Sequence, residues 1–326
     1  MKLLENRWQK HFWENKPRIF VLMKKEEHIP YQFNSISDLH RVLGLPKPLH
    51  PLVCLVDNTL ISVDKDQLPA SFLLNFYKIS YKKGLNGKIK YGQNYYDFDE
   101  GGLVFTSPNQ LLATTDDAEY VGYTLLIHPD FIRNYSLGRN IKNYGFFSYD
   151  IHEALHLSDK EKSTILSIFH HIEEELQLPI DDYSQDVIVT QIELLLNYSN
   201  RFYKRQFITR KAVNNDLLSK AENLLNDYFN KETALNKGLP TVQFLAEQLL
   251  VSPRYLSDML RSLIGQNAQQ YIHQKLIEKA KEVLSTSKAS VAEIAYQLGF
   301  EHPQSFNKLF KNKTSLSPLE FRQSFN

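Results

Sequence analysis

The chain has 326 residues, of which 42% are hydrophobic and 23% charged, as in a soluble globular protein with room for two domains. No apolar run approaches the roughly 18 residues of a membrane span, and the charged N-terminus lacks the apolar core of a signal peptide. The net charge of +1 is uneven: residues 201–326 hold 18 Lys and Arg against 11 Asp and Glu, which is +7 and leaves −6 for residues 1–200. A basic last third on an acidic remainder suits a nucleic-acid-binding module joined to a unit with another role.

The first part of the chain, to about residue 127, has the alternation and turn residues of short β-strands. The predicted strands cover 19–23, 52–56, 72–81, 88–98, 103–106 and 120–127. Their spacing and their many aromatic residues predict a barrel or a sandwich. The single Cys54 lies in the apolar run of the second strand, so we expect a buried, reduced thiol in a cytoplasmic protein.

The period becomes helical at Ser158, which forms a capping-box pattern with Glu161. A helix is predicted to about residue 178, where Pro179 ends it, and a second helix over about 185–203. Two adjacent amphipathic helices can pack on the preceding β unit, pair across a dimer, or do both. We expect residues 158–204 to form a helical pair that dimerises.

A polar, basic segment over 205–215 is the predicted linker. Leucine and alanine residues at helical spacing then predict a helix over 216–230. Gly238 and Pro240 break the chain before its last part.

The last 86 residues contain the same helix-turn-helix pattern twice, at 241–260 and 290–310. In both copies small or apolar residues occupy the inward positions, and the second turn is one residue longer. The corresponding residues are Leu245 and Ile294, Ala246 and Ala295, Leu249 and Leu298, Leu256 and Phe306, Leu260 and Phe310, and, after the repeats, Tyr271 and Phe321. Two small helical readers on one chain suit a protein that contacts DNA at two places.

Each copy also leaves polar side chains for the outer surface of its second helix. In the first copy these are Arg254, Tyr255, Ser257, Asp258 and Arg261. In the second they are His302, Gln304, Ser305, Asn307, Lys308 and Lys311. Gln and Asn pair with adenine, and Lys and Arg reach guanine or phosphate. A helical bundle without a ligand explains neither the duplication nor both polar sets.

A continuous helical pattern over 268–285 joins the two copies. Eighteen residues at about 1.5 Å each give roughly 27 Å, comparable with the roughly 34 Å between successive major-groove faces. The spacing therefore predicts that one chain enters two adjacent grooves.

Four segments resemble the AraC/XylS transcription regulators: AKEVL at 280–284, VAEIAYQLGF at 291–300, FNKLFK at 306–311 and LSPLEFR at 316–322. The resemblance covers about residues 216–326 and implies two helix-turn-helix units joined by a long helix. It places base-reading positions on Arg254, Ser257, Asp258, Pro303, Gln304, Asn307 and Lys308.

Two residues depart from the family pattern. Ser315 stands where the family usually has glycine, which predicts a tight or strained turn. Asp258 is acidic at a reading position, where it either accepts from cytosine or repels phosphate, so we expect the second reader to be the stronger.

The same resemblance implies an N-terminal cupin-like β-barrel over 1–157 that binds an effector or mediates dimerisation, and the run 95–110 looks like its strand-turn-strand. A metal-binding cupin needs a His-x-His pair, which this chain lacks, so we expect neither metal nor cofactor. The expected fold is multi-domain α+β, with the double helix-turn-helix domain at 216–326. The expected partners are double-stranded DNA, a small-molecule effector, a second copy of the chain and, for an activator, RNA polymerase.

The segment His152–His156 matches the His-Glu-x-x-His pattern of zinc peptidases. That chemistry needs both histidines on one helix face, with the glutamate as base. Because Ser158 begins a new helix two residues later, the motif is expected to lack helical geometry. We therefore expect a DNA-binding regulator and not an enzyme.

Overall fold

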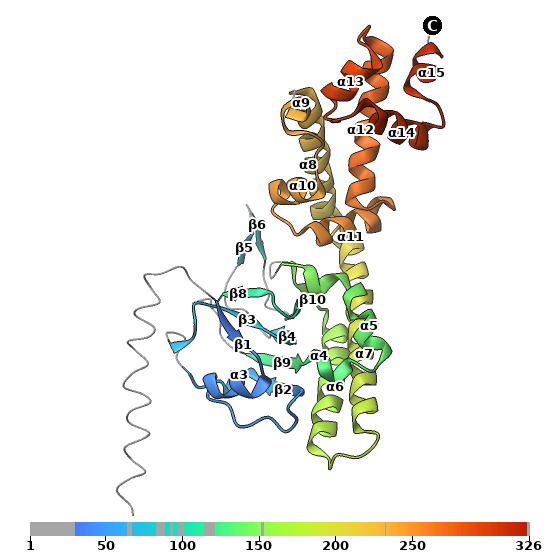
Figure 1. Ribbon diagram of the computed structural model, residues 1–326. Coiled ribbons are helices and arrows are strands. Elements are labelled where there is room, and N and C mark those ends of the chain that lie inside the picture. The colour runs from blue at the N-terminus through green and yellow to red at the C-terminus, as the bar shows by residue number, and fades with distance from the viewer. Residues whose placement is uncertain are drawn as a thin grey trace, which may run out of the picture.

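The computed structural model describes residues 30–63, 67–82, 89–91, 94–96, 101–113, 121–150, 153–231 and 233–324. An N-terminal unit of strands lies beside a long helical pair, and α7 (Ser184–Thr209) runs from this unit up to a C-terminal helical unit (Figure 1). The mixed α+β architecture predicted from the sequence is confirmed. The strand predicted at 19–23 lies outside the described residues.

Five strands form an antiparallel sheet with the order β10-β7-β4-β9-β2, and three form a second sheet with the order β1-β3-β8, in which β1 and β3 are parallel. The strands are β1 (Tyr31–Phe33), β2 (Val53–Asp57), β3 (Ser71–Leu74), β4 (Tyr77–Lys82), β7 (Gly102–Thr106), β8 (Leu111–Ala113), β9 (Gly122–Ile127) and β10 (Leu155–His156), besides the hairpin of β5 (Ile89–Tyr91) and β6 (Asn94–Tyr96). The run predicted as one strand at 72–81 is two strands, β3 and β4. The described strands form separate sheets and no single closed barrel.

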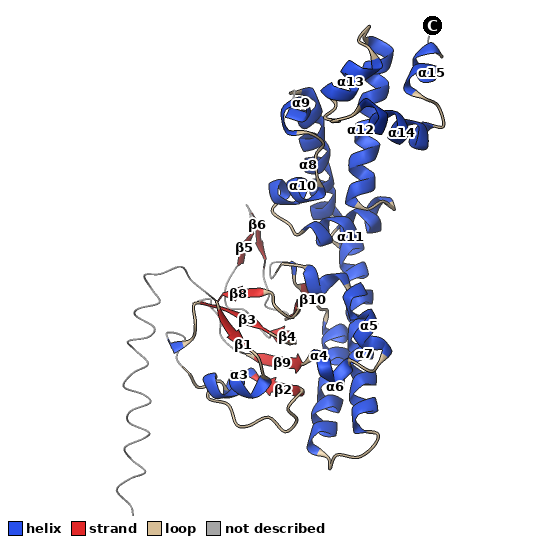
Figure 2. Ribbon diagram, in the orientation of Figure 1, coloured by secondary structure: helices blue, strands red, loops and turns tan. Residues whose placement is uncertain are grey.

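The large sheet buries both faces because residues alternate along each strand. On one face Ile79 and Tyr81 join the core that α6 (Asp159–Gln177) and α7 complete. On the other face Cys54 and Leu126 pack with the small sheet and with α3 (Ile36–Val42). Cys54 is buried, as predicted, and burial raises the pKa of its thiol to about 11. Figure 2 shows all the sheets on one side of the helical pair.

Short helical segments follow β9 and connect the sheet to the helical pair. They are α4 (Pro129–Ile132), α5 (Ser136–Asn140), η3 (Ile141–Asn143) and η4 (Gly145–Ser148); η1 (Asn58–Leu60) follows β2. The sequence pattern did not predict them, because segments of three to five residues are too short to show a helical period.

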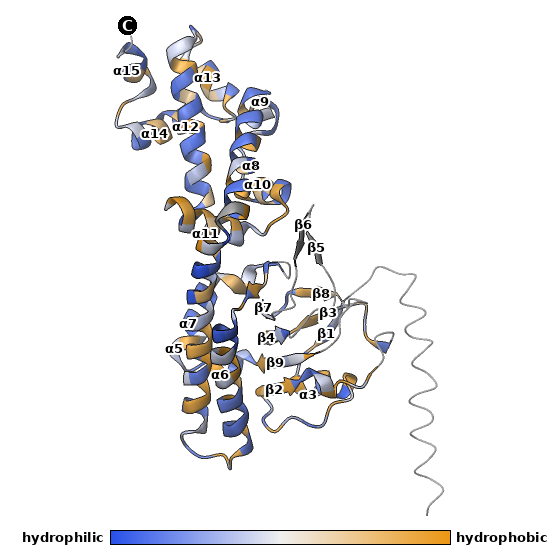
Figure 3. Ribbon diagram, turned by 180° about the vertical axis from the view of Figure 1, so that it is seen from behind, coloured by the Kyte–Doolittle hydropathy of each residue, from blue (hydrophilic) through white to orange (hydrophobic). Residues whose placement is uncertain are grey.

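The predicted helical pair is confirmed at its start, where the backbone N–H of Ser158 donates to the Glu161 carboxylate at 2.9 Å. The second helix is longer than predicted, because α7 continues to Thr209 and α8 (Lys211–Asn230) begins two residues later. Hence the predicted linker at 205–215 is helical on both sides of Arg210. Blue and orange segments alternate along α6 and α7, as expected of amphipathic helices (Figure 3).

The C-terminal unit is all helical. Its helices after α8 are α9 (Thr233–Lys237), α10 (Val242–Leu249), α11 (Pro253–Ile264), α12 (Ala268–Thr286), α13 (Val291–Gln297), α14 (Pro303–Thr314) and α15 (Pro318–Gln323). No helix in the described part of the chain combines the length and hydrophobicity needed to cross a membrane. One hydrophobic cluster continues from the large sheet through α7 and α11 into this unit, so the two units share a core.

Candidate nucleic-acid interface

Two helix-turn-helix units are formed, by α10 with α11 and by α13 with α14, as the repeated pattern predicts. Each begins with a side-chain cap. The Thr241 hydroxyl accepts from the Phe244 N–H at 3.0 Å, and Ser290 forms a capping box with Glu293. Of the inward residues common to both copies, Leu249 is partly buried. The others are buried: Leu245, Ala246, Leu256, Leu260, Ile294, Ala295, Leu298, Phe306 and Phe310.

The long helix between the two units is α12, which has 19 residues and therefore a length of about 28 Å. The predicted connecting rod is confirmed. It begins at a capping box of Asn267 and Gln270 and packs on α11, α13 and α15. The first recognition helix, α11, packs on α12, and the second, α14, is held through α13, which packs on both α12 and α14.

The second recognition helix, α14, has a polar outer face. Phe306 and Phe310 are fully buried and fix the helix against its unit. Around them the expected polar side chains are exposed, while Pro303 at the first helical position is partly buried. The exposed residues are His302, Gln304, Ser305, Asn307, Lys308 and Lys311.

The first recognition helix, α11, presents a different surface. The Asp258 carboxylate forms ion pairs with Arg254 and Arg261, each at 3.0 Å, and the Asp258 side chain is only 18% exposed. The acidic residue at this reading position is therefore neutralised within its own helix. Ser257 is partly buried.

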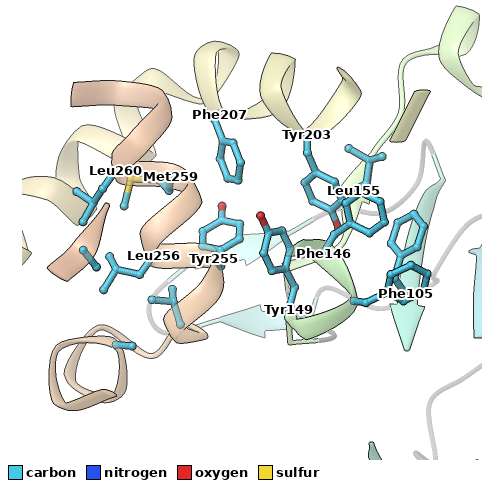
Figure 4. Close-up of a cluster of buried hydrophobic side chains, with 14 of the residues drawn as sticks. Phe105, Phe146, Tyr149, Leu155, Tyr203, Phe207, Tyr255, Leu256, Met259 and Leu260 are labelled. Carbon is cyan, nitrogen blue, oxygen red and sulfur yellow. The ribbon is translucent and has the colours of Figure 1, made fainter. Parts of the chain in front are cut away.

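Tyr255 corrects one expectation about this helix. We expect it from the sequence on the outer surface, but it is 7% exposed. Its ring packs edge-on against Tyr149 at 5.3 Å and Phe207 at 5.2 Å, between the N-terminal unit and α7 (Figure 4). An aromatic ring is amphipathic, so its position in the sequence pattern does not decide which side it faces.

The N-terminal unit also makes polar contacts with the start of α11. The Tyr149 hydroxyl donates to the Asp258 carboxylate at 3.0 Å. The Glu153 carboxylate accepts from the Ser252 backbone N–H at 2.6 Å and from the Ser252 hydroxyl at 2.5 Å. Burial raises the pKa of Glu153 to about 7, although the hydrogen bonds from Ser252 and Asp150 lower it. The sequence offered one signal for Glu153, its place in the His-Glu-x-x-His pattern.

The described part of that pattern, Glu153 to His156, is not an α-helix: His156 lies on β10, and α6 begins only at Asp159. His152 is outside the described residues. Within the described ranges, no three His, Cys, Asp or Glu side chains come together as metal ligands would.

Left-handed backbone positions end the helices of both units. In the first unit, Leu250 (φ +57°) follows α10 and Gly265 (φ +73°) follows α11. The equivalent positions in the second unit are Gly299 (φ +92°), after α13, and Ser315 (φ +65°), after α14. The expected strained turn at Ser315 is present, because this region costs a residue with a Cβ about 1–2 kcal/mol. Nothing in the sequence indicates a left-handed backbone at Leu250.

Comparisons with known proteins agree with this architecture. A helix-turn-helix domain family matches residues 245–324. The transcriptional activator RhaS of Salmonella paratyphi B is 30% identical over 141 residues, which are 43% of this chain and 46% of that protein, and RhaS of Salmonella newport gives the same figures. The chain thus spans about half the length of the curated relatives it matches.

Two solved structures are similar to about a third of this chain. The C-terminal domain of the response regulator yesN from Fusobacterium nucleatum is 33% identical, covering 31% of this chain and 97% of that one, with a TM-score of 0.27. The C-terminal domain of AraT from Geobacillus stearothermophilus is 27% identical, covering 33% and 84%, with a TM-score of 0.29. The named relatives are transcription regulators and not enzymes. The family match and the RhaS relatives, together with the repeated motif, thus show an AraC-type helix-turn-helix domain in the C-terminal part of the chain.

Proposed function

We propose that this protein is a sequence-specific regulator that reads two adjacent major grooves of duplex DNA with α11 and α14. The exposed polar face of α14 carries this proposal, because Gln304, Asn307 and Lys308 surround two fully buried phenylalanine anchors. Side chains held on a rigid helix are positioned well enough to read base edges. The length of α12 supports the spacing of two grooves.

In this proposal Gln304 and Asn307 pair with adenine edges, and Lys308 and Lys311 reach guanine or phosphate. Pro303 and Ser305, with His302 before them, lie where the N-terminus of α14 would meet the DNA backbone. On α11, the exposed guanidinium groups of Arg254 and Arg261 likewise reach guanine or phosphate in this proposal.

Substitutions on α14 test the assignment. Lys308→Ala should weaken binding to all duplexes and reduce the salt dependence of the affinity by about one counterion, whereas Gln304→Ala should lose preference at one base pair, by about 1–3 kcal/mol. The measurement is fluorescence anisotropy with the duplex selected by the wild-type chain from a random pool, at several salt concentrations. Lys160→Ala, an exposed lysine on α6, is the charge-matched control. Unchanged binding by the double variant Gln304→Ala, Lys308→Ala would contradict the proposal.

The second part of the proposal is that the N-terminal unit controls the protein through dimerisation. Exposed apolar side chains form a stripe along the start of α7, because Tyr183 at its N-cap, Val187 and Leu194 are separated by four and seven residues. Leu178 and Ile180 extend it at the turn before α7. Residues at this spacing suit a symmetric contact with α7 of a second copy.

Leu194→Glu should convert such a dimer to a monomer, because it places a charge in an apolar contact. Analytical ultracentrifugation of the full chain measures the change. Asn200→Glu is the matched control, since Asn200 is exposed on another face of α7. A wild-type chain that sediments as a monomer at all micromolar concentrations would remove this part of the proposal.

A cupin-like effector unit is the third part, and the inner side of β4 suggests an anionic effector. Lys78 and Lys82 share one face of β4, with Ser80 between them hydrogen-bonded to Thr124 at 3.0 Å. Leu126 on this face belongs to the core between the two sheets. Burial, together with the charge of Lys82, lowers the pKa of Lys78 to about 8. A bound carboxylate or phosphate would stabilise both ammonium groups.

Lys78→Met should therefore raise the melting temperature of the free protein, because it removes a charge from a partly buried position. Benzoate, hexanoate or inorganic phosphate should stabilise the wild type and leave Lys78→Met unchanged. Differential scanning fluorimetry measures both effects, with Lys160→Met as control. Equal stabilisation of wild type and Lys78→Met by every anion would exclude this site.

A further inference from the structure

The N-terminus of the first recognition helix is already occupied by a carboxylate of the same chain. Glu153 is 6% exposed and accepts three hydrogen bonds, two from Ser252 at the N-cap of α11 and one from the Asp150 backbone N–H at 2.7 Å. The Ser252 hydroxyl in turn accepts from the Tyr255 N–H at 3.2 Å. The carboxylate therefore sits on the positive end of a helix of 12 residues.

An amide and a hydroxyl at a helix N-terminus are also the groups that bind a DNA phosphate. We propose that Glu153 is an internal substitute for a backbone phosphate, so that α11 binds either its own N-terminal unit or duplex DNA. This inference rests on the proposed function and adds to it the regulation of the first recognition helix, α11.

A second, independent contact covers the reading residues of α11. A Cβ atom built on Gly145 of η4 would lie 2.4 Å from the Asp258 carboxylate and 2.6 Å from Arg254 Nε, so the backbone of the N-terminal unit touches both side chains. Tyr149 donates to Asp258 beside them. With η4 in place the Asp258 side chain is only 18% exposed, so a duplex must displace η4 to reach this carboxylate and the covered side of Arg254. The absence of a side chain at Gly145 is what allows this close approach.

The contact leaves the second reader free. His302, Gln304, Asn307 and Lys308 on α14 are exposed in the same structure. In the closed form α14 therefore presents its whole polar face to DNA, whereas the N-terminus of α11 is covered. Displacement of Glu153 by phosphate adds α11, and with it further phosphate contacts and a steeper salt dependence.

Glu153→Ala tests the proposal, because it removes the acceptor for both Ser252 donors and should favour the open form. We expect the variant to bind duplex DNA at least tenfold more tightly than wild type, with a steeper salt dependence. Tyr149→Phe, which removes one hydroxyl and keeps the ring, should give a smaller gain of about threefold. Asp182→Asn, exposed at the turn before α7, is the control for the change of charge.

The probes are random-sequence 40-base-pair DNA and the duplex that the wild type selects from it, both measured with the full chain by anisotropy. Wild-type affinity and salt dependence in both Glu153→Ala and Tyr149→Phe would overturn the inference while leaving the proposed function intact. Failure of the wild type and of every variant to bind either duplex would instead overturn the proposed function. If Glu153→Ala does not fold, Tyr149→Phe alone decides. Binding by Tyr149→Phe that equals wild-type binding would then contradict the proposal that the N-terminal unit covers α11.

Discussion

Gly299→Ala should unfold the second helix-turn-helix unit, or destabilise it by at least about 3 kcal/mol. The backbone at Gly299 has φ +92°, where a residue with a Cβ is strained. A Cβ atom there would also lie 2.6 Å from the Gly238 carbonyl carbon and 2.9 Å from the Ala234 carbonyl oxygen. These are backbone atoms of α9 and of the residue that follows it, and they cannot move aside as a side chain would. Chemical denaturation followed by circular dichroism measures the loss.

Gly265→Ala is the matched control. Gly265 ends the first recognition helix with φ +73°, but a Cβ atom there meets nothing within 4 Å. Its substitution should cost only the backbone strain, about 1 kcal/mol. Similar losses for the two variants would show that the close approach of α9 to the second turn does not matter.

Much of the C-terminal unit could be predicted because its information is local. The inward apolar residues, the caps at Thr241 and Ser290, and the span of α12 all follow from helical period and capping chemistry within a few residues. Gly299 adopts the left-handed backbone of its turn without a Cβ to strain it, whereas nothing about a leucine indicates the same conformation at Leu250.

The contacts between the two units could not be predicted, because they join residues about a hundred positions apart. Glu153 and Ser252 each carry a local signal, a metal motif and a helix cap, and neither signal indicates the other residue. Asp258 shows the same limit. From the sequence it is an unfavourable charge at a DNA-reading position, whereas the structure pairs it with Arg254, Arg261 and Tyr149. Only tertiary structure places these partners together.

DNA binding by the wild type should tighten as pH rises from about 5.5 to about 8, by about tenfold. Burial raises the pKa of Glu153 from 4.5 to about 7 in the closed form. Closing therefore takes up a proton. The closed form is most favoured below the ordinary pKa of 4.5, because burial favours the protonated Glu153 side chain, and this preference is lost as pH rises through 7, where closing must bury a charged carboxylate. The open form, which alone presents α11 to DNA, becomes more populated.

The titratable groups around Glu153 do not reverse the expected tightening of DNA binding between pH 5.5 and 8. His156 stays neutral, because burial and the charges of Arg210 and Arg205 lower its pKa to about 4. The pKa values of Tyr149 and Tyr203 are raised, so both phenols stay protonated. The nearby acidic residue Asp150 raises the pKa of Glu153 further.

The measurement is the anisotropy titration at constant ionic strength, in a His302→Gln background that removes the imidazole beside the second reader. Glu153→Ala should bind tightly at every pH, because its open form no longer depends on a proton. The affinities of wild type and Glu153→Ala should therefore be similar at high pH, where the closed form of the wild type is least stable, and should differ most at low pH. If the pH dependence persists unchanged in Glu153→Ala, another group must cause it. The contact between Glu153 and Ser252 would then not depend on proton binding.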